Sequence, residues 1–223
     1  MVSRGRVHAH QRQRSPSRTR RESRGEKPPS TADPEANGRL TATTGVLLVV
    51  LLAAEGVTIL RIRPLLVPHV FVGLVLVPPV LLKVATTTWR AARYYLGDPA
   101  YRSKGPPPMA LRLLGPLAVV LTVTVLASGV ALLFTPSSER GLMLTVHKAS
   151  FVLWFGVLTV HVLGHLFDTA SLAPRDYVRR TRQQVRGATS RQWALAASVA
   201  VGLVLAAALT PHTGSWLHLN PSR

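Results

Sequence analysis

Five long apolar segments, separated by segments rich in Arg and Lys, constrain this 223-residue chain more than any other feature. Each approaches the roughly 20 residues that a helix needs to cross a hydrocarbon core. Lipid offers the backbone no hydrogen-bond partners, and the segments lack the alternating pattern of outer-membrane strands, so only helices satisfy every peptide group. The sequence therefore predicts an all-α, polytopic membrane bundle with five spans, at about 42–60, 65–85, 113–134, 142–167 and 193–210, the last being the shortest.

The distribution of charge divides the chain into three parts. Residues 1–40 hold ten Arg and Lys, many Ser and Pro, and almost no large apolar side chains, so we expect a disordered basic tail. Residues 41–211 are predicted to form the transmembrane domain, and 212–223 a short tail beyond it. We favour a solvated tail that helps to set orientation. Anionic lipid is the alternative partner, and we expect no nucleic acid.

The imbalance of Arg and Lys also predicts the orientation. Of the 27 Arg and Lys, 22 lie in the tail and in the two longer loops, and five lie on the other side. Loops rich in Arg and Lys stay in the cytoplasm, so we expect a multi-pass protein of the cell membrane with a cytoplasmic N-terminus and an extracytoplasmic C-terminus. The excess of Arg over Lys is typical of a GC-rich bacterial genome.

Two features limit the arrangement and the chemistry. The connections at 61–64 and 135–141 are short, so the first span should neighbour the second, and the third should neighbour the fourth. The chain has no cysteine, which excludes disulfides, thiolate metal sites and covalently attached haem.

Histidines inside the spans are the strongest candidates for function, because ionisable side chains in a membrane are costly. His69 is the fifth residue of the second span and His147 the sixth of the fourth. Both spans run in the same direction, so the two imidazoles should lie at similar depth, roughly 6–8 Å below the outer boundary. Two imidazoles at one level can ligate one haem iron from opposite faces. His161 lies 14 residues after His147, about 21 Å deeper on nearly the same face.

Two histidines 14 residues apart on one span, with a partner on another, resemble the pattern of membrane cytochromes b. These include the haem-b anchor subunits of formate dehydrogenase and nickel hydrogenase and the ferric-reductase-like proteins. The resemblance implies a four-helix core with at least one haem b between the second and fourth spans. It implies that His69 and His147 are the axial ligands and that His161 is a candidate ligand of a second haem.

The same resemblance implies an electron-transport role. The chain has no domain of its own for a soluble substrate, so we expect at most an electron-transfer subunit with a redox partner subunit. A quinone or an external donor would supply the electrons.

One position departs from the family pattern. Where a second ligand of the second span would stand, 14 residues after His69, the chain has Lys83. We expect this lysine to extend toward the headgroups or to pair with Asp168 rather than to ligate iron. One haem is therefore expected, and His165, one turn beyond His161, is a candidate for metal, quinone or proton contact.

Other residues fit a cofactor pocket but have simpler explanations. Gly73, one turn after His69, would let a porphyrin approach, or it would only allow close helix packing. Glu55 could accept a hydrogen bond from either histidine or pair with Arg61. Four cations near the outer boundary could pair with haem propionates or act as interfacial anchors: Arg61, Arg63, Arg140 and Lys148.

A second hypothesis belongs to another class. In it the chain is a non-redox membrane protein, permease-like or an assembly factor, whose intramembrane His, Lys and Glu side chains conduct protons or hold helices together. A haem b spectrum would separate the two hypotheses.

Overall fold

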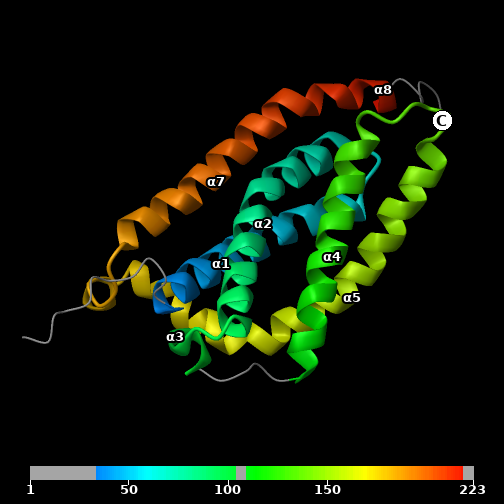
Figure 1. Cartoon of the computed structure of the whole chain (residues 1–223). Helices are drawn as coiled ribbons and strands as arrows, with labels where there is room; N and C mark the ends of the chain where they lie inside the picture. Colours follow the sequence, from blue (N-terminus) through cyan, green and yellow to red (C-terminus); the bar gives the residue numbers. More distant parts are fainter. Residues whose placement is uncertain (1–33, 104–108, 218–223) are drawn as a thin grey trace, which may run out of the picture. The chain divides into compact units, whose positions relative to one another are not determined.

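The computed structural model describes residues 34–103 and 109–217, and over these residues the chain is helical and contains no strand (Figure 1). Five of the described helices are long and apolar enough to cross a membrane, which confirms the predicted all-α, five-span architecture. These are α1 (Pro34–Leu60), α2 (Leu66–Tyr95), α4 (Met109–Leu132), α5 (Arg140–Leu172) and α7 (Ala188–Leu209). The short helices are α3 (Pro99–Arg102), η1 (Ala173–Asp176), α6 (Arg179–Arg182), η2 (Thr210–Thr213) and α8 (Gly214–Leu217).

The helix α1 begins inside the segment 1–40 that the sequence assigned to the tail. Proline suits the first position of a helix, and Glu35 in the first turn complements the partial positive charge there. The assigned tail residues 1–33 lie outside the described residues. At the other end, residues 212–217 of the second assigned tail belong to η2 and α8.

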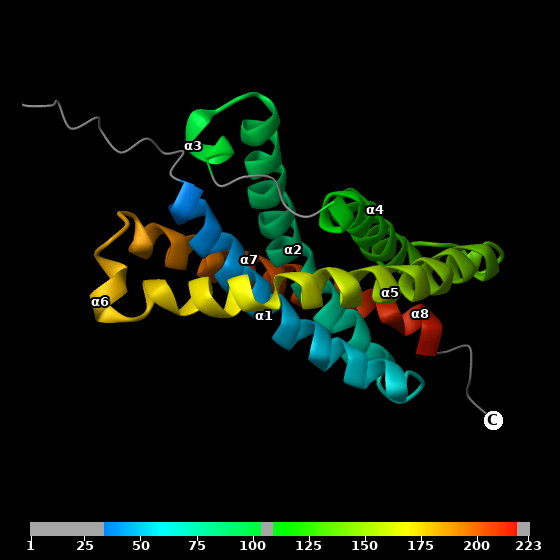
Figure 2. The ribbon, with the colours of Figure 1, turned by 90° about the horizontal axis from the view of Figure 1, so that it is seen from below.

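Four helices form a ring around a common interior. As the short loops predicted, α1 packs on α2 and α4 packs on α5. α2 also meets α4, and α1 meets α5, which crosses it (Figure 2). α2 and α5 therefore occupy opposite corners of this four-helix core, and they share little close backbone contact. α7 lies outside the core, against α2 and α1.

Many large apolar side chains point away from the helix contacts. Val50, Leu153 and Val204, for example, are 62%, 62% and 70% exposed. Such extensive apolar surface is unfavourable in water but suits contact with lipid chains. The helices thus have the surface of membrane spans.

α7 approaches α2 closely at Gly202. A Cβ atom at this position would lie 2.6 Å from the backbone oxygen of Val75 and 3.1 Å from its Cα. Small residues allow this kind of backbone approach between membrane helices. Ala206, one turn further along α7, is fully buried.

We expect Gly202→Ala to destabilise the packing of α7 on α2 by about 1–3 kcal/mol, because the backbone of α2 cannot move aside as a flexible side chain would. The thermal unfolding temperature of the detergent-purified protein should fall. Gly156→Ala is the control, since a Cβ there meets nothing within 4 Å. Equal unfolding temperatures for the two variants would contradict this interpretation.

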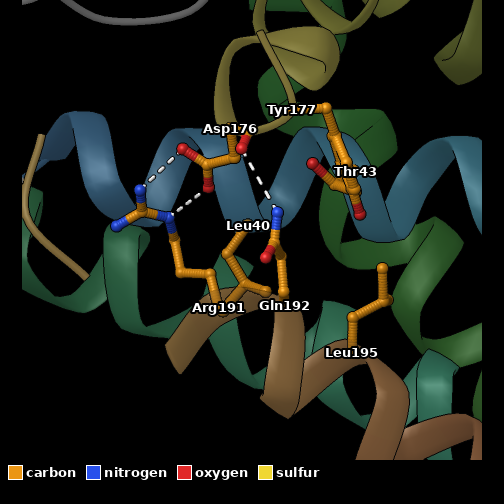
Figure 3. A pocket seen from close by; sticks show the side chains of 7 residues that line it. All are labelled: Leu40, Thr43, Asp176, Tyr177, Arg191, Gln192 and Leu195. Atoms are coloured by element: carbon orange, nitrogen blue, oxygen red, sulfur yellow. Dashed lines mark hydrogen bonds and ion pairs between the residues drawn. The ribbon is translucent and has the colours of Figure 1, made fainter. Parts of the chain in front are cut away.

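Three buried charged residues join the start of α1 to the connection between α5 and α7. Asp176 is 3% exposed and accepts hydrogen bonds from Arg191 (Nε, 2.5 Å; Nη2, 2.7 Å) and from Arg39 (Nη1, 3.2 Å). Gln192 also donates to the backbone oxygen of Asp176, at the rim of a pocket of about 10 Å³ (Figure 3). We call Arg39, Asp176 and Arg191 the arginine clasp. The sequence interpretation treated Arg39 and Arg191 only as orientation signals, but both side chains are buried and paired.

The clasp predicts a loss of stability in acid. Burial alone would raise the pKa of Asp176, but the hydrogen bonds from Arg191 and Arg39 outweigh burial and hold that pKa below its ordinary value of 3.8. A group with a depressed pKa stabilises the fold fully above its unfolded pKa, and this contribution is lost as the pH falls through the lower folded pKa. Stability from Asp176 should therefore be constant above about pH 4 and decline below it.

Asp176→Asn should remove that pH dependence and should cost about 3–5 kcal/mol at neutral pH, because Arg191 stays buried without a counter-charge and Arg39 keeps only its ion pair with Glu35 (2.8 Å). Thermal unfolding between pH 3 and pH 7 measures both effects. The exposed Glu139 provides the control variant, Glu139→Gln, which should behave as the wild type. If Asp176→Asn loses as much stability in acid as the wild type does, the clasp is not the cause.

Candidate functional site

His69 on α2 is held by two oxygen atoms of α1. Its Nδ1 lies 2.9 Å from Oε1 of Glu55 and 3.0 Å from Oγ1 of Thr58. The Thr58 hydroxyl donates its single hydrogen to the backbone oxygen of Glu55 at 2.6 Å. In the neutral imidazole, Nδ1 of His69 therefore carries the proton that these side-chain oxygens accept, and Nε2 keeps its lone pair.

His147 on α5 is held in the same way by α4. Its Nδ1 lies 3.1 Å from the backbone oxygen of Val125 and 3.1 Å from Oγ of Ser128. Because a carbonyl oxygen only accepts, Nδ1 is again the protonated nitrogen and Nε2 keeps its lone pair. The Ser128 hydroxyl itself donates to the backbone of α4.

The two imidazoles meet inside the four-helix core. Their ring centroids are 6.4 Å apart and their planes make an angle of 77°. Within the described part of the chain neither Nε2 has a hydrogen-bond partner. A bond from a metal to an imidazole nitrogen is about 2 Å long, so two imidazoles on opposite sides of one metal have centroids roughly 6 Å apart. The distance between the rings fits a metal that His69 and His147 would hold between them.

No third ligand accompanies this pair. Among residues 34–103 and 109–217 no group of three or more His, Asp or Glu side chains could hold a metal ion. Over these residues, His69 and His147 therefore offer a metal two ligands from the chain. Two histidines are also the protein ligands that would hold a haem.

Two glycines make room for these histidines and their partners. A Cβ on Gly73 would lie 3.3 Å from Oε1 of Glu55, and a Cβ on Gly129 would lie 3.1 Å from Cε1 of His147. Gly73, singled out in the sequence for porphyrin approach, thus makes room for the carboxylate that holds His69. Sequence reasoning missed Gly129, although a Ser-Gly pair in the middle of an apolar span was a usable signal.

The cations near these histidines fall into two groups. Arg61 and Arg63, in the loop before α2, and Lys148 on α5 are exposed and form no side-chain hydrogen bond or ion pair with described residues. Arg140 instead donates to Oγ of Ser215 at 2.9 Å and lies over the ring of Trp216 at 4.4 Å. The first group therefore keeps all its donors for an anion, whereas Arg140 keeps its charge but uses donors on Ser215.

The second candidate site is differently organised. The ring centroids of His161 and His165 are 4.9 Å apart, and Nδ1 of His161 is buried with no partner among the described residues. Lys83 donates from Nζ to the backbone oxygen of Thr41 at 2.6 Å, in space left by Gly45, whose Cβ would lie 3.0 Å from that Nζ. Lys83 therefore ties α2 to α1. The side chain of Asp168, its expected partner, lies outside the described part.

Comparisons with models of protein families, with curated proteins and with solved structures found no match to this chain. The main feature of the site is that two histidines from opposite helices have fixed Nδ1 atoms, while their Nε2 atoms have no partner in the described part of the chain.

Proposed function

We propose that this chain is an integral membrane b-type cytochrome that holds one haem b between α2 and α5. His69 and His147 would be the axial ligands. One observation carries the proposal: each histidine commits Nδ1 to an acceptor and leaves Nε2 unpartnered, with the rings 6.4 Å apart. In metal sites the ligating histidine commonly donates its other ring N–H to a carboxylate or a backbone carbonyl. Glu55 and Val125 stand in these two roles.

The chain's own residues would orient the haem and adjust its environment. The haem, when bound, supplies one-electron redox chemistry. The side chain of Glu55 would orient His69, and the backbone carbonyl of Val125 would orient His147. The free cations Arg61, Arg63 and Lys148 would pair with the propionates. A second haem would need a ligand opposite His161, and Lys83, which stands at the corresponding position of α2, already donates to Thr41. His161 therefore stays a candidate ligand only.

Electrons would reach this haem through a partner. The described helices carry apolar outer surfaces and form no soluble catalytic domain. We therefore expect an electron-transfer subunit of a membrane oxidoreductase, supplied by a quinone or by a redox partner subunit.

One observation favours the alternative, a non-redox protein that moves protons. Oε2 of Glu55 is buried and has no hydrogen-bond partner among the described residues. Ionisable side chains inside membrane spans commonly belong to proton pathways. Haem content decides between the two functions.

We expect purified protein to show a reduced-minus-oxidised haem b spectrum, and His69→Ala and His147→Ala each to abolish it, because one lost axial ligand leaves the iron weakly held. His161→Ala and Lys83→Met are the controls and should retain the haem. Pyridine haemochrome quantitation should give about one haem per chain, as two axial ligands imply.

Three results would contradict this assignment. A wild-type protein without haem would favour the proton-moving alternative. A low-spin haem retained in the double variant His69→Ala/His147→Ala would place the site elsewhere. Two haems per wild-type chain, falling to one in Lys83→Met, would make Lys83 a ligand.

We also propose that the N-terminus is cytoplasmic and the C-terminus extracytoplasmic, since 22 of the 27 Arg and Lys fall in the three sequence segments that five spans would put on one side. A reporter that is active only outside the cytoplasm should be active when fused after Arg223. The same reporter fused in the loop near Lys104 should be inactive. The opposite pattern would reverse the orientation.

A further inference from the structure

A basic pocket lies in the connection between α5 and α7. It has a volume of about 460 Å³ and is lined by seven residues, of which none is acidic: Arg179, Arg182, Gln183, Val185, Arg186, Gly187 and Ala188. Ligand pockets commonly measure about 300–1,000 Å³. The pocket is thus large enough for a small anionic group.

The arginines of this pocket keep most of their hydrogen-bonding capacity. The side chains of Arg179 and Arg186 make no hydrogen bond or ion pair with described residues. Arg182 uses one Nη2 donor, to Oγ1 of Thr189 at 3.1 Å. The start of α7 adds the partial positive charge of a helix N-terminus. The cap residue Gly187 offers no side-chain hydrogen bond to the first N–H groups of this helix.

The arginine clasp fixes the walls of the pocket. Arg39 donates to the backbone oxygen of Thr181 in α6 at 2.9 Å, and Arg191 donates to the backbone oxygen of Arg186 at 2.7 Å. Gly187 makes the turn into α7 with φ of +82°, a conformation that favours glycine. The buried arginines thus hold the backbone in place while the exposed arginines stay free, and such preorganisation lowers the cost of binding an anion.

The surroundings place this pocket at a membrane interface. It lies where α5 ends and α7 begins, at the ends of two spans. Tyr177 and Trp193 nearby are 57% and 71% exposed. Exposed Tyr and Trp at the ends of membrane helices lie at the level of the lipid headgroups.

We propose that this pocket binds the phosphate group of an anionic phospholipid. Guanidinium groups match phosphate oxygens in charge and in paired hydrogen-bond geometry. The interfacial position favours a lipid over a soluble phosphate, because the headgroups lie at that depth. The site is separate from the histidine pair and does not depend on a bound haem.

The test uses the full chain, purified in non-ionic detergent and supplemented with phosphatidylglycerol, phosphatidylcholine or inorganic phosphate. Native mass spectrometry counts the retained lipid, and the thermal unfolding temperature reports stabilisation. We expect that, of these three, only phosphatidylglycerol binds and raises the unfolding temperature. Equal stabilisation by inorganic phosphate, or equal binding of phosphatidylcholine, would overturn the assignment to an anionic lipid.

A pair of variants locates the binding. Arg179→Gln/Arg186→Gln removes two pocket charges without touching the clasp, and Arg90→Gln/Arg180→Gln removes two exposed charges that do not line the pocket. The first should weaken binding of phosphatidylglycerol about tenfold or more, and the second less than threefold. Both variants keep residues 1–33, so lipid held by those basic residues affects them equally. Equal affinity of the two variants would overturn the pocket as the site.

Discussion

Every polar group inside a membrane span must find its partner within the protein, and this constraint governs the structure. The hydroxyls of the spans satisfy it locally, as Thr44 does by donating to the backbone oxygen of Leu40 at 2.8 Å. Histidine has two ring nitrogens, and its own helix does not offer a hydrogen-bond partner to both of them. In His69 and His147 a neighbouring helix takes up Nδ1, and Nε2 has no hydrogen-bond partner among the described residues. The proposed haem would complete this pattern.

The same constraint explains the opposite end of α1. Arg39 and Glu55 stand 16 positions apart, which corresponds to about 24 Å along the helix. Arg39 is fully buried and is tied to Asp176 and Thr181, whereas Glu55 holds a histidine with one oxygen and leaves the other unpaired. Removing one partner of such a buried pair is costly, because the remaining charge stays buried without compensation. The half-satisfied carboxylate of Glu55 is instead typical of a functional site.

The haem proposal and the lipid proposal depend on different parts of the structure and can fail separately. The haem proposal depends on the interior between α2 and α5, and the lipid proposal depends on the connection between α5 and α7. The clasp links the second site to the fold, since the arginines that hold Asp176 also hold the backbone of the pocket. Anionic lipid at this pocket would thus add to the stability of the same end of the bundle that Asp176 supports.

The sequence by itself determined the five spans, the all-α class, the neighbouring pairs and the similar depth of His69 and His147, because apolar length and helical rise are properties of each segment alone. It also singled out Lys83, which in the structure donates to the backbone oxygen of Thr41. Only the tertiary structure decided which partners the polar groups take. Thr58, Ser128 and Gly129 are ordinary small residues until α1 and α4 bring them to the histidines, and Arg39 and Arg191 count as loop charges until Asp176 lies between them. The hydrogen-bond partner of each polar group depends on contacts between segments far apart in the sequence. No property of a single segment determines these contacts.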